Sequence, residues 1–298
     1  MFKSSVLFVI ACLTLASAYA TPANTGKINT LGELQGYLLN HKADFGQFRL
    51  RGPFAVDVQK DYTVRLSATE RINTDLFLSA PSEKAPLVII VHGHDNSKEA
   101  HTLQGMHLAS WGMHTLVLQL PRKGPWVKNG KTLVRIVNAI VRRPEIINSR
   151  IDVKKIILAG HSFGGAAVAI ALAERVPVAG GILLDPAVVI RDFPAVLRKI
   201  NTPVMLLGAD EQISSARNRS YFYRYIPRGI AEISIKGAAH EDAQYAEYSP
   251  NPDESQVAFV SALVSAAFSL SSTGKLDYAW ASFGDGFKNG MFFNVKRK

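Results

Sequence analysis

The chain has 298 residues, of which 47% are hydrophobic and 19% are charged. It is therefore long enough for one domain with a large core, and its composition excludes a disordered or fibrous protein. The formal net charge is +10, but the basic residues are spread along the chain without a dense stripe or a recognisable nucleic-acid module, so we expect a solvated basic surface and no nucleic-acid binding.

The first twenty residues are typical of a secretory signal. Lys3 precedes an apolar run over 6–15, and Ala18-Tyr19-Ala20 offers a small-x-small cleavage site. The run is too short to cross a bilayer, so we expect an exported protein, periplasmic or secreted, without integral membrane association and with 1–20 removed. The alternative is a lipoprotein anchored through Cys12, because Val9-Ile10-Ala11-Cys12 is similar to a lipoprotein box. Cys12 is the only cysteine, so cleavage after Ala20 leaves no cysteine for an internal disulfide.

The next part of the chain predicts one helix followed by antiparallel strands. Thr30 and Glu33 have capping-box spacing, and the apolar residues that follow share one helical face. Short alternating or β-branched runs at 54–58, 62–66 and 74–78 then indicate strands separated by turn residues.

From Pro86 onward, apolar runs without alternation take turns with helical stretches. The runs indicate parallel strands buried on both faces, at 87–91, 115–120, 155–159, 180–184, 204–207 and 231–235. The helical stretches are 98–111, 131–143, 166–175, 216–225 and 254–269. This order predicts an α/β fold over 21–270: a mostly parallel, doubly wound sheet with an antiparallel start and helices on both faces. The aromatic-rich stretch 271–298 either packs on this domain or extends from it.

A nucleophile elbow is predicted at Gly160-His161-Ser162-Phe163-Gly164, which matches G-x-S-x-G. The string alone is not specific, but an apolar strand run precedes it and a helical stretch follows it, as the sharp turn requires. Such a turn holds the serine in strained backbone geometry at a helix N-terminus, where negative charge is favoured. We therefore expect Ser162 to be a nucleophile.

A serine hydroxyl needs a base, and in a fold with this elbow the acid and then the histidine follow the serine along the chain. His240 is the one histidine after Ser162, and it lies in a loop directly after the last strand run. Such loops gather at the carboxyl edge of a parallel sheet, where ligands bind. We expect His240 to be the general base, and not His161, because adjacent side chains at the elbow point in different directions.

Two further motifs are expected to border the site. The run 87–91 ends in His92-Gly93-His94, which can direct the His94 N–H toward the nucleophile, so that His94 and Phe163 form an oxyanion hole with their backbone N–H groups. His92 is expected to support this loop by hydrogen bonding. Trp126 follows another strand end, and it either stacks on an acyl group in the cleft or is a surface-loop side chain.

Together these motifs resemble the α/β-hydrolase superfamily over about 74–269. The elbow is similar to those of cutinase-like polyester hydrolases, dienelactone hydrolases and platelet-activating-factor acetylhydrolases, and its serine differs from the Asp of dehalogenases. The resemblance implies a serine hydrolase that cleaves carboxylic esters through an acyl-enzyme. A peptidase or acyltransferase with the same residues, and a binding protein that keeps the fold without turnover, are the alternatives.

The triad acid is left open among three residues. In most members of the superfamily it follows the strand after 180–184, which suggests Asp210 or Glu211. Asp185 lies one strand earlier, in Leu183-Leu184-Asp185-Pro186, which is similar to the Leu-Asp-Pro of pancreatic-type lipases. Both places are strand ends from which a carboxylate could orient His240.

The site is expected to be open. Only 186–202 separates two consecutive strand runs at the place where this fold often carries a cap domain, and that is too short for a cap. We therefore expect a shallow cleft for small-molecule or polymeric esters, in a monomeric protein. The sequence shows no metal-ligand spacing and no glycine loop for a dinucleotide, so no metal and no cofactor are expected.

Overall fold

The protein is described from a computed structural model. The described residues are 28–40, 46–81, 83–210, 218–246, 253–272 and 277–298. The expected signal segment 1–20, the lipoprotein alternative at Cys12 and the candidate acid Glu211 lie outside them.

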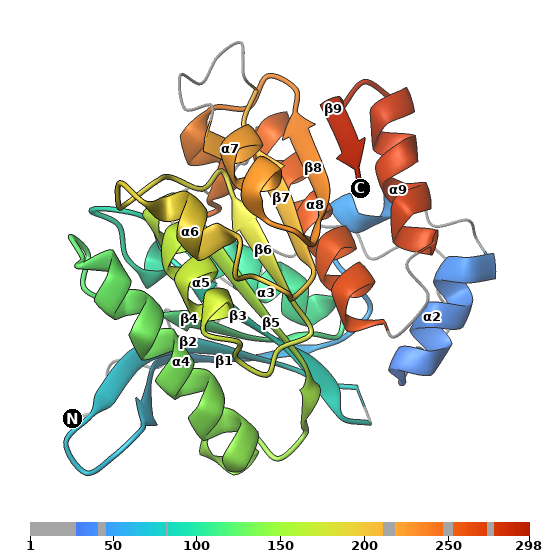
Figure 1. The fold of residues 1–298 in the computed structure, drawn as a ribbon. Coiled ribbons are helices and arrows are strands. Elements are labelled where there is room, and N and C mark those ends of the chain that lie inside the picture. Colours follow the sequence, from blue (N-terminus) through green and yellow to red (C-terminus); the bar gives the residue numbers. More distant parts are fainter. Residues whose placement is uncertain (1–27, 41–45, 82, 211–217, 247–252, 273–276) are drawn as a thin grey trace, which may run out of the picture.

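One nine-stranded sheet runs through the domain in the order β1-β2-β4-β3-β5-β6-β7-β8-β9 (Figure 1). β1 and β2 are antiparallel, β3 to β8 form a parallel block joined antiparallel to β2 through β4, and β9 returns antiparallel on β8. The strands are β1 (Val56–Arg65), β2 (Arg71–Ser79), β3 (Ala85–Val91), β4 (His114–Leu118), β5 (Ile151–His161), β6 (Gly180–Leu184), β7 (Val204–Gly208), β8 (Gly229–Ile235) and β9 (Phe292–Arg297). The predicted α/β sheet with an antiparallel start is confirmed.

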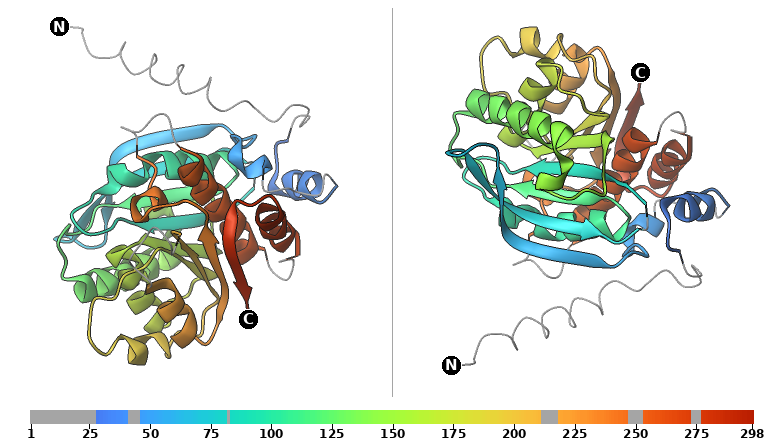
Figure 2. Two further views of the ribbon diagram at one scale, coloured as in Figure 1. Left: turned by 90° about the horizontal axis from the view of Figure 1, so that it is seen from above. Right: turned by 90° about the horizontal axis from the view of Figure 1, so that it is seen from below.

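Helices cover both faces of the sheet (Figure 2). One face carries α3 (Thr102–Ser110) and α8 (Glu254–Ser271), and the other carries α4 (Trp126–Arg142), α5 (Phe163–Ala173), α6 (Phe193–Leu197) and α7 (Asn218–Tyr225). Alternate residues of β3 enter opposite cores, Val88 with α8 and Leu87 with α4 and α5. Burial on both faces is why the parallel strands show no polar alternation.

The first described helix confirms the capping box. α2 (Leu31–Asn40) follows Thr30, whose hydroxyl accepts the Glu33 N–H at 3.0 Å while the Glu33 carboxylate accepts the Thr30 N–H at 3.0 Å. Glu83 adds a second cap from outside the helix, because its carboxylate accepts the Leu31 N–H at 2.6 Å. These bonds satisfy N–H groups that a helix start leaves free.

Helix α8 is long and apolar enough to span a membrane by length and composition, but 78% of its apolar window is buried inside the domain. Phe259, Leu263 and Phe268 of this helix belong to the core cluster on its face of the sheet. Within the described part of the chain α8 therefore packs as a core helix.

Several boundaries differ from the sequence prediction, and three of these differences change the extent or the type of an element. The runs 54–58 and 62–66 form one strand, β1, which bends at a bulge between Gln59 and Tyr62 instead of breaking. Helix α4 begins at Trp126, earlier than the predicted 131–143. The predicted helix 98–111 starts as a 3-10 turn, η2 (Lys98–His101).

The C-terminal stretch packs on the domain. It forms α9 (Asp277–Lys288) and β9, and β9 extends the sheet beyond β8. Phe283 of α9 and Phe292 of β9 are buried, with ring centroids 6.1 Å apart, in the same core cluster as α8. Apolar contact with that cluster explains why this aromatic-rich stretch packs against the domain.

Candidate active site

Ser162 lies at a sharp turn between β5 and α5. Its backbone has φ 55° and ψ −123°, a combination that residues other than glycine rarely adopt. A Cβ on Gly160 would lie 2.5 Å from the Gly164 carbonyl oxygen, and a Cβ on Gly164 would lie 2.4 Å from the His92 carbonyl oxygen. Both neighbouring atoms are backbone and cannot easily move, so the turn requires glycine at both positions.

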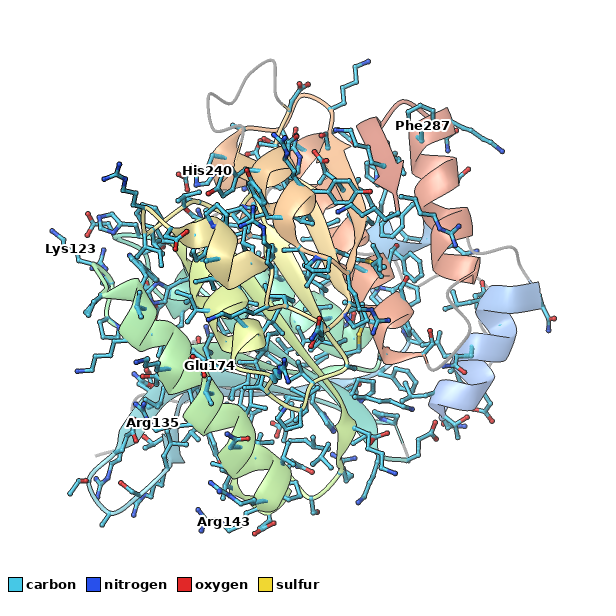
Figure 3. All side chains as sticks on the ribbon, in the orientation of Figure 1. Lys123, Arg135, Arg143, Glu174, His240 and Phe287 are labelled. Carbon is cyan, nitrogen blue, oxygen red and sulfur yellow. The ribbon has the colours of Figure 1, made fainter. Side chains whose placement is uncertain are left out.

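His240 reaches the elbow from the loop after β8. It opens a 3-10 turn, η4 (His240–Ala243), in which the Asp242 carboxylate accepts the Ala239 N–H at 2.7 Å. The His240 carbonyl oxygen accepts a hydrogen bond from Nε2 of His161 at 3.0 Å, and the two imidazole rings lie in contact, tilted by 41° with centroids 4.5 Å apart. The loop is thus bound to the residue next to Ser162. Figure 3 shows His240 at the end of the domain opposite Arg143.

Asp185 is the carboxylate that meets His240. It follows β6, is 1% exposed, and its Oδ2 accepts the His240 Nδ1–H at 2.5 Å. Its Oδ1 accepts the Ala209 N–H at 3.2 Å. Asp210 lies one strand further along, and its carboxylate instead accepts the Gly237 N–H at 2.9 Å. Of the two described acids that the sequence left open, the structure therefore bonds Asp185 to the imidazole.

The charge of Asp185 controls the titration of His240. Burial works to lower the pKa of His240, but the hydrogen bond and the negative charge of Asp185, with a further contribution from Glu241, outweigh it, so that the pKa is raised above its ordinary value. His161 contacts the imidazole ring of His240, and burial holds the pKa of His161 well below its ordinary value. His161 is therefore neutral at pH 7 and donates its Nε2 proton to the His240 carbonyl.

The loop after β3 comes close to the nucleophile. A Cβ on Gly93 would lie 3.0 Å from Nδ1 of His161 and 3.1 Å from the Cβ of Ser162, so a larger residue there would require one of these side chains to shift. His92 supports the loop as expected: its Nδ1 lies 2.8 Å from the Gly93 carbonyl oxygen and its Nε2 accepts the Leu120 N–H at 3.2 Å. Among the described residues, no backbone carbonyl accepts the N–H of His94 or of Phe163. These are the two donors expected to hold an oxyanion.

Trp126 packs with two other aromatic rings next to this loop, and we call the three rings the aromatic wall. Trp126 is the first residue of α4 and only 7% exposed, so the surface-loop alternative is wrong. Its ring centroid lies 6.3 Å from that of His94 and 5.8 Å from that of Phe163, and the latter two rings meet edge to face at 5.4 Å. The aromatic wall therefore consists of Trp126 and the side chains of His94 and Phe163, the two residues whose N–H groups the sequence analysis expected to form the oxyanion hole.

Arg219 is a neighbour of the site that the sequence analysis missed. Its Nη1 lies 3.5 Å from Oδ1 of Asp185, and its side chain is 1% exposed. Nothing in the sequence distinguishes it from the other basic residues around it, because its burial depends on how α7 packs against β7 and β8.

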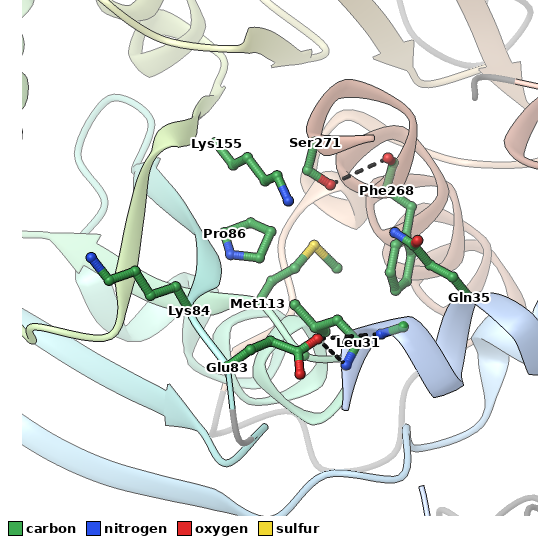
Figure 4. A pocket seen from close by; sticks show the side chains of 11 residues that line it. Leu31, Gln35, Glu83, Lys84, Pro86, Met113, Lys155, Phe268 and Ser271 are labelled. Atoms are coloured by element: carbon green, nitrogen blue, oxygen red, sulfur yellow. Dashed lines mark hydrogen bonds between the residues drawn. The ribbon is translucent and has the colours of Figure 1, made fainter. Parts of the chain in front are cut away.

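A separate cavity of about 250 Å³ lies between α2, the start of β3 and the end of α8 (Figure 4). Pro86 and Lys155, which line it, are toward the amino ends of β3 and β5, whereas the elbow and His92 are at or just beyond the carboxyl ends. The Glu83 carboxylate in this cavity is already used to cap α2. The cavity is therefore distinct from the site around Ser162.

Comparison with known proteins agrees with this geometry. A family model described as alpha/beta hydrolase family matches residues 88–285, which is more than half of the chain and includes the elbow, Asp185 and His240. No curated protein matches the chain. The family match supports a hydrolase activity, and the chain belongs to the alpha/beta hydrolase family.

Proposed function

We propose that the protein is an exported serine hydrolase that cleaves carboxylic esters through an acyl-enzyme on Ser162. The observation that carries the proposal is the 2.5 Å hydrogen bond between His240 and Asp185, made by a histidine whose loop is bound to the elbow. A strained serine, an oriented imidazole and a buried carboxylate are the three parts that nucleophilic ester cleavage needs. Export is supported by the signal-like segment 1–20.

The first half of the reaction acylates the enzyme. Asp185 holds the imidazole with its proton on Nδ1, so that Nε2 of His240 is free to accept the Ser162 proton as the hydroxyl oxygen attacks the ester carbonyl carbon. The N–H groups of His94 and Phe163 donate to the oxyanion, and each such donor typically contributes about 10²–10³ in kcat. The tetrahedral intermediate then collapses, and the alcohol leaves with the proton held on His240.

The second half releases the acid. Water gives a proton to Nε2 of His240 and attacks the acyl carbonyl carbon, the oxyanion occupies the same two N–H groups, and Ser162 recovers its proton as the carboxylic acid leaves. During both halves the imidazolium is stabilised by Asp185, which stays ionised.

The short β6–β7 connection supports the proposal of an open cleft that accepts ester substrates of varied size. Between β6 and β7 the described chain has no helix longer than α6, so no cap domain covers the elbow from that connection. We propose that the aromatic wall of Trp126, Phe163 and His94 packs against the acyl group, since such rings offer apolar area with little loss of side-chain entropy. Small and polymeric esters both fit such a cleft, which is consistent with the resemblance to polyester hydrolases.

A panel of p-nitrophenyl esters of increasing acyl length tests this function, with p-nitroanilides and added acyl acceptors as controls. We expect ester turnover above amide turnover, hydrolysis above acyl transfer, and covalent labelling by a fluorophosphonate. Ser162→Ala should abolish turnover and labelling, whereas Ser67→Ala, in the β1–β2 turn, should change neither. If the folded wild type is not labelled, the fold serves binding without turnover; preferential amide cleavage or acyl transfer would favour a peptidase or acyltransferase.

A further inference from the structure

A buried charge cluster lies directly behind the proposed triad acid. Arg219 of α7 places Nη1 3.5 Å from Oδ1 of Asp185 and Nε 3.3 Å from Oε1 of Glu232 on β8. The side chains of all three residues are at most 1% exposed. Burying three charges is costly unless each is paired and hydrogen bonded, so the arrangement is held against a large desolvation penalty.

The backbone makes room for this arginine at one position. A Cβ on Gly208, the last residue of β7, would lie 2.0 Å from Nη1 and 2.4 Å from Cδ of Arg219. The guanidinium therefore crosses the end of β7 where only glycine allows it to pass. Its Nη1 then donates to the Ala209 carbonyl oxygen at 2.8 Å, while the N–H of the same Ala209 donates to Oδ1 of Asp185 at 3.2 Å.

This geometry holds the two oxygens of Asp185 differently. Oδ1 receives the Ala209 N–H and faces the guanidinium, while Oδ2 receives the His240 Nδ1–H. A carboxylate fixed at Oδ1 cannot rotate about its Cβ–Cγ bond without losing the contacts with the Ala209 N–H and the Arg219 guanidinium. Oδ2 is therefore kept in line with the imidazole.

Glu232 extends the cluster to the C-terminal strand. Its Oε1 accepts from Arg219 and from the Ser220 hydroxyl at 2.9 Å, and its Oε2 accepts from Lys296 of β9 at 3.2 Å. The edge strand β9 thus contributes a cation to the same charge cluster that contacts Asp185.

We propose that Arg219 is a positioning residue, which holds the Asp185 carboxylate in the orientation that His240 needs. The inference rests on the proposed function, since it gives Asp185 the role of triad acid. The competing role is a purely structural ion pair that ties α7 to β8. The two roles differ in what happens to the molecules that remain folded: positioning changes how fast each site turns over, whereas a structural pair changes only how many sites survive.

The test is kcat per active site, with sites counted by fluorophosphonate titration, for Arg219→Gln/Glu232→Gln. This double variant removes a buried cation and a buried anion together, which avoids leaving one of them without its partner. We expect kcat per titrated site to fall at least tenfold with KM within threefold of wild type. The acid limb of kcat/KM should move to lower pH, because a loosened carboxylate stabilises the imidazolium less.

Two other variants and a matched control sharpen the result. Arg219→Lys keeps the charge and should recover most of the lost kcat per site. Gly208→Ala keeps every charge but displaces the guanidinium, so it should lower kcat per site as well, and it serves if the double variant does not fold. The control is Arg135→Gln/Glu70→Gln, an Arg–Glu pair at the surface with a 2.6 Å contact, which should leave kcat per site unchanged.

If kcat per titrated site in the double variant equals the wild-type value, the positioning role is overturned. Gly208→Ala decides in the same way if that double variant does not fold. An acid limb that moves to higher pH at constant kcat would also overturn the positioning role, because that shift reports only loss of a nearby positive charge. Failure of the proposed function would look different. In that case the wild type would not titrate, or Ser162→Ala would still hydrolyse esters.

Discussion

Replacing Asp185 by Asn tests the triad acid, because it removes the charge while keeping the shape. The new amide has one oxygen for two positions. The Ala209 N–H and the Arg219 cation both favour oxygen at the Oδ1 position, so the NH2 group is expected to face Nδ1 of His240. Because NH2 can only donate, the imidazole proton moves to Nε2. A histidine protonated at Nε2 cannot accept the proton of Ser162.

The size of the effect follows from this tautomer. In serine hydrolases of known mechanism the equivalent change lowers kcat by about 10⁴, which corresponds to about 5.4 kcal/mol of activation free energy. We expect a loss of that order for Asp185→Asn with a p-nitrophenyl ester, and a KM within a few-fold of wild type, since the carboxylate is 1% exposed and bonded to His240 and Ala209. Steady-state kinetics normalised to titrated sites measures both.

Asp210→Asn is the matched control, because its carboxylate accepts the Gly237 N–H and an amide oxygen can do the same. We expect less than a tenfold loss there. A kcat within tenfold of wild type in Asp185→Asn would refute the role of Asp185 as the triad acid. A loss of about 10³ or more in Asp210→Asn, or in Glu211→Gln, would move the role of the acid to that residue.

Three further predictions test the titration and packing of the domain. The acid limb of kcat/KM should lie above the ordinary histidine pKa, because the pKa of His240 is raised and only its neutral form accepts a proton. A pH profile whose acid limb lies below about pH 6.5 would contradict this. Gly164→Ala should lower the free energy of unfolding by about 1–3 kcal/mol or more, since its Cβ would meet a backbone oxygen at 2.4 Å. Gly36→Ala in α2, where a Cβ would have no atom within 4 Å, should be neutral or stabilising by up to about 1 kcal/mol. Urea unfolding compares the two variants, and equal changes in the free energy of unfolding would argue against a tight elbow. Burial, with the nearby charge of Arg150, lowers the pKa of His114 to about 4, so its unfolded form takes up a proton as pH falls below about 6.5 while the folded form does not. In His114→Asn the loss of stability between pH 7 and pH 5 should therefore be smaller by roughly 2 kcal/mol, and an unchanged loss in urea unfolding at the two pH values would refute it.

Most of the sheet was predictable because burial on both faces leaves a simple pattern. The run 180–184 matches β6 at both ends, and the other parallel strands differ from their predicted runs only at their termini. Such strands contact helices on both sides, so they tolerate only apolar residues for their whole length. The edges of the sheet carried less information. β1 is partly exposed and bends at a bulge around Asp61, so its polar residues resembled a turn between two strands.

The C-terminal strand escaped prediction for a related reason. β9 is an edge strand that pairs with β8 alone, and its Lys296 and Arg297 are exposed. Charged residues are common on edge strands, where they discourage pairing with other chains, but they remove the apolar pattern by which a strand is recognised. Its place in the sheet depends on the packing of Phe292 against α9, a contact that no local pattern reveals.

The position of the acid shows where local pattern stops being sufficient. Asp185 and Asp210 both follow a parallel strand, both are nearly buried, and both lie within reach of the β8–η4 connection. The two acids differ in the groups that hydrogen bond to each carboxylate. The Gly237 N–H occupies the carboxylate of Asp210, whereas the contacts of Asp185 with Ala209 leave one oxygen directed at the imidazole of His240. Those partners come from other strand ends and turns, so the choice between the two acids is made by the assembled sheet edge and not by either local sequence.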